Sequence, residues 1–199
     1  MANVIVLVKG YARKRKGIET ASPSSVLIEE RGKRILVDPG SNAAKLLTAL
    51  KKNRISKKSI DSLFLTHFHA DHLLNISRFP DVTVLADGAI WSKDTIVAYG
   101  KFIPKTGIRI CKTPGHCKDH ESLLVKTAHG IITVAGDVFW WNDDEAQQID
   151  LKSLLSYKDP YATDMKALRR SRRRLLKEAD LIIPGHGKMF ASPIRKAKS

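Results

Sequence analysis

The stretch Thr66-His67-Phe68-His69-Ala70-Asp71-His72 decides the fold and the chemistry expected of this chain. The apolar run from Ser59 to Leu65 comes directly before it, so the histidines begin where a buried strand is expected to end. His67 and His69 are two residues apart and point the same way while the chain is still extended. Asp71 and His72 follow where a helix is expected to begin, near Ala70, and to run through Leu73, Leu74 and Ile76. The motif therefore predicts ligands for two neighbouring metal ions.

Three further metal-binding side chains follow three other apolar runs. Each stands just past a strand-like segment: His116 after residues 108–111, Asp137 after residues 131–135 and His186 after residues 181–183. A glycine precedes each of them, which allows a close approach of the backbone or a positive φ. Four strand ends are thus expected to face one site.

A structural explanation is available for any single histidine, because most histidines in folded domains are hydrogen-bonded surface or core residues. His129 keeps that interpretation, since Ala128-His129-Gly130 has the pattern of a hairpin turn. His116 and His186 would be interpreted in the same way in isolation. Seven such donors, each following an apolar run, favour a two-metal site instead.

The order of these donors resembles the motif order of the metallo-β-lactamase superfamily. In that family, H-x-H-x-D-H precedes a histidine, a bridging aspartate and a last histidine. The resemblance covers nearly the whole chain, and residues 134–139, 171–175 and 179–190 resemble one branch of it. It implies a four-layer αββα sandwich of mixed α and β class, as a single domain of residues 1–199 with a basic tail from about residue 191. It also implies the ligands: His67, His69 and His116 for one metal, Asp71, His72 and His186 for the other, and Asp137 as the bridge.

The predicted activity is that of a binuclear metal-dependent hydrolase. Two divalent cations, Zn²⁺ in the first instance and iron or manganese as alternatives, would lower the pKa of a shared water from about 15.7 towards neutrality and produce a bridging hydroxide. Asp71 and Asp137 are the candidate catalytic carboxylates, and no covalent intermediate is expected. His120 would hold a ligand or give a proton to the leaving group, and a structural role is the preferred alternative.

The net charge of +15 is the second informative feature. Basic clusters occur at residues 13–16, 51–58 and 169–174, and such an excess attracts polyanions, which would concentrate nucleic acid or phosphorylated substrates near the surface. Apolar residues recur at helical spacing through the last cluster, so its arginines are expected to line a solvated helix face. Residues 13–16 lie in a predicted loop and are the cluster expected to touch substrate.

The substrate is less closely defined by the sequence. Phosphoester hydrolysis with broad ester tolerance, nucleic-acid phosphodiesters included, is the preferred prediction. A carboxyl-ester, lactone or thioester hydrolase needs only the metal site, and a mononuclear iron persulfide dioxygenase shares much of the motif. The aromatic run Phe139-Trp140-Trp141 would either wall the pocket or belong to the core.

Length and composition restrict the remaining alternatives. A chain of 199 residues with 43% hydrophobic content can bury one substantial core. No apolar run reaches the ~20 residues of a membrane span, so a cytoplasmic protein without a membrane partner is expected. Cys111 and Cys117 match no zinc or redox motif and are expected to be reduced. The oligomeric state stays open, a homodimer included.

Overall fold

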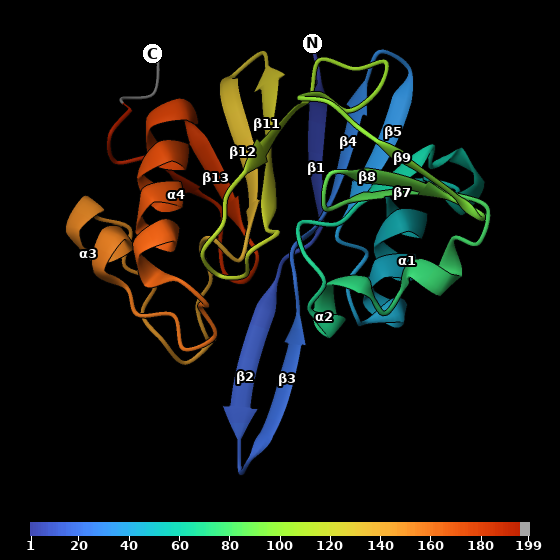
Figure 1. Ribbon diagram of the computed structural model, residues 1–199. Coiled ribbons are helices and arrows are strands. Elements are labelled where there is room, and N and C mark those ends of the chain that lie inside the picture. Colours follow the sequence, from blue (N-terminus) through green and yellow to red (C-terminus); the bar gives the residue numbers. More distant parts are fainter. Residues whose placement is uncertain (196–199) are drawn as a thin grey trace.

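Two β-sheets packed face to face form the centre of the protein, and helices cover both outer faces (Figure 1). The computed structural model describes residues 1–195. The last four residues of the predicted basic tail, 196–199, lie outside the described part of the chain. The first sheet contains seven strands in this spatial order: β1 (Asn3–Val8), β4 (Ser25–Glu30), β5 (Lys33–Val37), β6 (Ser62–Phe64), β7 (Thr83–Ala86), β8 (Ala89–Ser92) and β9 (Thr95–Ala98).

The second sheet supplies three of the four strand ends that carry predicted ligands. It contains five strands in this spatial order: β10 (Arg109–Lys112), β11 (Glu121–Thr127), β12 (Gly130–Gly136), β13 (Leu181–Pro184) and β14 (Phe190–Ala191). Strands β12 and β13 run parallel, so their carboxyl ends meet at one edge of the sheet. The predicted hairpin turn at His129 joins β11 to β12.

Two of the helices, α1 and α4, begin and end close to the predicted positions. The helix bounds are α1 Ala43–Lys52, α2 Ala70–Leu73, α3 Leu151–Ser156 and α4 Met165–Glu178, with short 3₁₀ helices at Lys57–Ser59 and Ile76–Arg78. Asn42 caps α1 and Asp164 caps α4, because each side chain accepts a hydrogen bond from a backbone N–H of the first turn. Among residues 1–195, no helix has the length and apolar character of a bilayer-crossing segment.

Three apolar clusters separate the layers. Alternate residues of β4 face opposite sides: Val26 and Ile28 point between the sheets, while Leu27 points outward. The outward cluster contains Leu46 and Leu50 of α1, and a third cluster joins leucines of α4 to the outer face of the second sheet. Helix, sheet, sheet and helix therefore form the predicted αββα sandwich.

The predicted basic loop after β1 is wrong, because this segment forms a β-hairpin. Strands β2 (Tyr11–Arg15) and β3 (Ile18–Ser22) pair antiparallel and project from the body at the end near α2 (Figure 1). Lys16 and Gly17 form the tight turn with φ of 47° and 79°. Lys14 and Glu19 face each other as an ion pair across the strands. The hairpin shows no apolar alternation because the residues towards its tip are exposed, so periodicity could not reveal it.

Other differences have local causes. Helix α2 ends at Leu73 instead of continuing through Ile76, because the backbone N–H of Asn75 donates to Gly40 and not to the preceding turn. Strands β8 and β9 and helix α3 were not predicted. Strand β9 is exposed along its whole length, and α3 has only six residues, so neither carries a strong periodic signal.

Candidate metal centre

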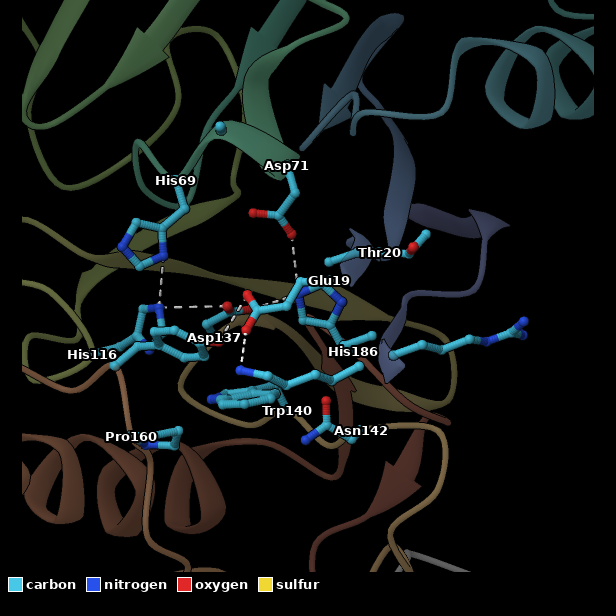
Figure 2. A pocket seen from close by; sticks show the side chains of 16 residues that line it. Glu19, Thr20, His69, Asp71, His116, Asp137, Trp140, Asn142, Pro160 and His186 are labelled. Carbon is cyan, nitrogen blue, oxygen red and sulfur yellow. Dashed lines mark hydrogen bonds and ion pairs between the residues drawn. The ribbon is translucent and has the colours of Figure 1, made fainter. Parts of the chain in front are cut away.

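All seven predicted ligands come together at the edge where the strands end. The ligand atoms form two groups, and within each group they lie within 4.8 Å of one another. The groups are His67, His69, His116 and Asp137 in the first, and Asp71, His72 and His186 in the second. Figure 2 shows His69 and Asp71 entering the cavity from one side, with Trp140 opposite them. Apart from Asp137, which was expected to bridge both metals, the two groups have the members that the family resemblance implies, and metal binding by them stays a prediction.

Asp137 lies between the two groups, with one carboxylate oxygen towards each. Its Oδ2 is 3.5 Å from His116 Nε2 and 3.9 Å from His67 Nε2. Its Oδ1 is 3.3 Å from His72 Nε2 and 3.6 Å from His186 Nε2. Burial alone would raise the pKa of Asp137, but the facing imidazoles hold it well below its usual range. A carboxylate placed in this way can bridge two cations.

The chemistry of the buried polar atoms fits metal ions. His67 Nε2, His72 Nε2 and Asp137 Oδ1 are buried and have no hydrogen-bond partner within the described residues. An unpaired buried donor or acceptor costs about 1–3 kcal/mol, so three in one place need an explanation. All three belong to the predicted ligand set and face its centre. Imidazole nitrogen and carboxylate oxygen are ligands of zinc, iron and manganese.

Glycines permit the close packing around the bridge. Gly136 precedes Asp137 with φ of 53°, a conformation that side chains disfavour. Gly115 precedes His116 with φ of 136°, and a Cβ there would lie 2.1 Å from the backbone nitrogen of Leu168. Gly185 has no positive φ, but an added Cβ would lie 1.8 Å from Asp137 Oδ1. The three positions thus need glycine for the two reasons that the sequence suggests.

Asp38 holds the H-x-H-x-D-H segment in place from a neighbouring strand end. Its Oδ2 lies 2.9 Å from His72 Nδ1 and accepts the hydroxyl of Thr66 at 2.8 Å, while its Oδ1 accepts the Thr66 N–H. The Thr66 hydroxyl also lies 3.0 Å from His67 Nδ1. With their Nδ1 atoms engaged in this way, both ligand histidines direct Nε2 towards the centre. Asp38 therefore orients His72 directly and His67 through Thr66.

Asp159 is a functional residue that the sequence reasoning missed. Its Oδ2 lies 2.7 Å from Nδ1 of His116, and the carboxylate is completely buried. It lies in the connection between α3 and α4, 43 residues from its partner. No local pattern marks a lone aspartate of this kind. Its position is that of the carboxylate that orients a metal-binding histidine and increases its basicity.

Replacement of Asp159 by asparagine is expected to weaken metal binding at the first group by about 10–100-fold. The amide keeps the size of the side chain but removes the negative charge that fixes the His116 ring. Competition against a chromophoric chelator measures the affinity. Asp144→Asn, at an exposed position, is the matched control and should bind metal like the unaltered protein. Equal affinities for the two variants would contradict the role given to Asp159.

His120 lies behind the metal ligands. Its Nε2 accepts the backbone N–H of Asp137 at 3.2 Å, and its Nδ1 lies 2.9 Å from the Thr113 hydroxyl. Burial, together with the neighbouring His116, lowers the pKa of His120 to about 3, so the ring stays neutral and can accept this bond. His120 does not line the cavity. The geometry thus favours a positioning role and offers no support for proton donation to a leaving group.

Protons are expected to compete with metal at the second group. Burial disfavours a charged His186, but the carboxylates of Asp137 and Asp71 outweigh this and raise its pKa to about 9. Below that pH the metal-free ring carries a proton that a cation must displace. Metal affinity should therefore fall as the pH is lowered, roughly tenfold per pH unit for each displaced proton. A chelator competition series across neutral pH measures this, and a flat profile would contradict it.

The metal ligands open onto a cavity of about 620 Å³ that the β2–β3 hairpin borders. Arg13 and Lys14 of the hairpin line it, and the backbone carbonyl of Tyr11 contacts His186 Nδ1 at 3.0 Å. Trp140 and Tyr161 form an aromatic wall with ring centroids 5.6 Å apart. Phe139 and Trp141, in contrast, pack in the core behind the second sheet. The predicted aromatic run thus divides between pocket and core.

The fold and the paired ligand groups define a class of metal-dependent hydrolases. Residues 19–130 match the metallo-beta-lactamase superfamily. A curated relative from Mus musculus, Metallo-beta-lactamase domain-containing protein 1, is 32% identical over 94% of this chain and 73% of its own length. The chain therefore belongs to the metallo-beta-lactamase superfamily, whose members are generally hydrolases with metal sites.

Two further relatives show how the similarity is distributed. The protein of the same description from Xenopus laevis is 29% identical over 94% of this chain and 81% of its own length. A hydroxyacylglutathione hydrolase from Stenotrophomonas maltophilia is 32% identical, over 48% of this chain and 39% of its own length. The first similarity extends across both sheets, and the second covers about half the chain.

Solved structures share the fold at low sequence identity. A Thermotoga maritima protein described as metallo-beta-lactamase-like superposes with a TM-score of 0.71 at 18% identity, covering 96% of this chain and 99% of the other. A dizinc quorum-quenching lactonase gives 0.62 at 17% identity over 85% and 73% of the two chains. A protein in a di-iron-bound form gives 0.59 at 22% over 85% and 89%. These neighbours support the sandwich and leave the metal of this chain open.

Proposed function

We propose that this protein is a binuclear zinc-dependent phosphodiesterase that acts on nucleic-acid phosphodiesters and tolerates other esters. The observation that carries the proposal is the position of the β2–β3 hairpin, which brings Arg13 and Lys14 to the cavity that contains the two ligand groups. A phosphodiester carries a negative charge at the reacting group, whereas a lactone or thioester does not. Cations at the mouth of a hydrolytic site favour the charged substrate.

The residues around the cavity would have different roles in the reaction. Cations held by the two groups would activate water as the nucleophile and stabilise negative charge on the substrate. Asp71, with its side chain 25% exposed, lies nearest to solvent among the carboxylates of the two groups and would orient the attacking water. Asp159, Asp38 and His120 keep the ligands in position. Arg13 and Lys14, which are paired with Asp143 and Glu19, would exchange these carboxylates for the phosphate oxygens that do not react.

The aromatic wall provides the second part of the substrate contact. Tyr161 is about half exposed, and Trp140 lies beside it at the cavity. A nucleobase next to the scissile phosphate would stack against these rings, with a contribution of about 1–3 kcal/mol per base. An apolar acyl group would fit the same wall. The aromatic pair therefore supports binding without deciding between the two classes.

Lactone or thioester hydrolysis is the second candidate, and specific similarities favour it. One partial relative is a hydroxyacylglutathione hydrolase, and one structural neighbour is a lactonase. This candidate needs the metal centre and the aromatic wall but not the hairpin cations. Removal of Arg13 and Lys14 should then leave ester turnover unchanged.

Metal content per chain and turnover, measured on one sample, test the proposal. Two equivalents of zinc with hydrolysis of bis-nitrophenyl phosphate, lost in His69→Ala, would support it. Hydrolysis of a nitrophenyl ester alone would favour the second candidate. A single iron per chain with no hydrolysis of either substrate would overturn both and favour a mononuclear dioxygenase.

A further inference from the structure

A second cavity, of about 590 Å³, lies between the base of the hairpin and helix α1. Its lining contains four cationic side chains and one acidic side chain. The cations are Lys9, Arg13, Lys45 and Lys52, and the acid is Asp143. The metal-binding residues are absent from this lining, so the cavity is separate from the metal centre. A concave surface with this charge attracts anions.

The single acid does not neutralise the cavity. Asp143 is bound to Arg13 at 2.6 Å, so these two charges compensate each other. Lys9, Lys45 and Lys52 form no ion pair within residues 1–195, although Lys14 and Lys33 form ion pairs elsewhere on the surface. Three uncompensated positive charges therefore share one depression. Lys9 comes from the end of the β1 segment and the other two from α1, so folding brings them together.

Tyr11 gives this depression a defined wall. The Lys45 ammonium lies 3.9 Å from the centroid of the Tyr11 ring, which is 8% exposed. The ring is fixed at its other end, because the Tyr11 hydroxyl accepts a hydrogen bond from Asn42 Nδ2 at 3.1 Å. The contact with the Tyr11 ring restricts the Lys45 side chain, so less side-chain conformational entropy is lost when an anion binds.

The depression is connected to the metal centre through the same hairpin strand. Arg13 lines both cavities. Tyr11, whose side chain borders the second cavity, contacts the ligand His186 through its backbone carbonyl. A single extended ligand that carries charges at intervals along its length can therefore occupy both cavities. A nucleic-acid strand has this property, since every nucleotide carries a phosphate.

We propose that the depression formed by Lys9, Lys45 and Lys52 binds a backbone phosphate of a nucleic-acid strand whose scissile phosphodiester lies at the metal centre. This inference rests on the proposed phosphodiesterase function and extends it to a second contact with the substrate. Lysine is a flexible point charge, so the contact is independent of base sequence. It increases the affinity for long substrates and leaves the chemical step unchanged.

Helix α4 carries the competing basic surface. Arg170, Arg173 and Lys177 line a smaller depression there, together with Arg174 and Glu178. Arg174 is paired with Glu178 at 2.9 Å. This surface shares no residue with the metal cavity. A strand that reaches the metal centre has no reason to contact α4, so this surface serves as the matched control.

Binding of a fluorescent oligothymidylate to the metal-loaded protein, across a salt series, tests the inference. Lys45→Ala/Lys52→Ala should weaken binding roughly tenfold at low salt and reduce the salt slope by about 0.7 for each lost phosphate contact. Arg170→Ala/Arg173→Ala should behave like the unaltered protein. Loss of binding in the α4 variant alone, or no change in either, would overturn the proposal. Because both lysines are exposed on a helix, alanine should not impair folding.

Turnover provides a second, independent measurement. The KM for an oligonucleotide that carries a nitrophenyl phosphodiester should rise about tenfold in Lys45→Ala/Lys52→Ala, with kcat unchanged, while bis-nitrophenyl phosphate, which has one phosphate, should show no change. An equal rise in KM for both substrates would overturn the proposal of a second phosphate-binding site. If the protein binds the strand through these lysines but cleaves neither substrate, the proposed phosphodiesterase function fails and the anion site remains.

Discussion

Asp137→Asn is expected to reduce hydrolysis by about a thousandfold or more and to lower the metal content below two ions per chain. Asp137 presents one carboxylate oxygen to each ligand group, whereas each of the other described ligands belongs to a single group. Asparagine keeps the shape but removes the negative charge that two cations share. The loss of several kcal/mol of charge stabilisation in the transition state corresponds to this factor.

The measurement combines elemental analysis with steady-state turnover. Circular dichroism checks that the fold is retained, which is expected because asparagine has almost the same volume. Asp144→Asn again provides an exposed aspartate as the matched control. A variant that keeps two tightly bound ions and a tenth of the activity would show that Asp137 is not the bridge.

Gly185→Ala should destabilise the protein by about 1–3 kcal/mol and disturb the second ligand group. The new Cβ would lie 1.8 Å from Asp137 Oδ1 and 3.0 Å from the carbonyl carbon of Gly136. The backbone cannot move away freely, because the Gly185 N–H donates to Gly136 and Phe139, and its carbonyl accepts from Ser24. The bridging carboxylate must therefore move instead, at the expense of metal binding.

Thermal unfolding with and without metal separates the two effects. The melting temperature should fall by about 2–4 °C for each kcal/mol lost. Gly100→Ala is the matched control, since no atom lies within 4 Å of the added Cβ and its φ is not positive. If Gly185→Ala unfolds at the same temperature as Gly100→Ala and binds two ions, the close approach at the bridge is not required.

A mixed α and β layered domain and the composition of the metal centre follow from local pattern, whereas the four-layer sandwich was implied by the family resemblance. Buried strands followed by a glycine and a ligand mark the site, because such a strand must leave the core at its edge. Helix α4 was predicted from apolar residues that recur at helical spacing. The prediction that all arginines of the α4 cluster line a solvated helix face was wrong for one of them. Arg172 is buried, and its guanidinium donates to the carbonyls of Val138 and Tyr157, so it is not part of a solvated face.

Periodic apolar pattern reports burial along one segment, and for that reason the chain alone indicated a mixed α and β domain, the strand ends and the seven candidate ligands. It carries no information about which distant segments meet. The Arg13 to Asp143 pair spans 130 positions, and Asp159 reaches His116 across 43. The hairpin at the metal cavity, the carboxylate behind His116 and the lysine depression all depend on such contacts. These features arise only when packing of the two sheets brings separate segments together, and their energies are set by the burial and charge of that arrangement.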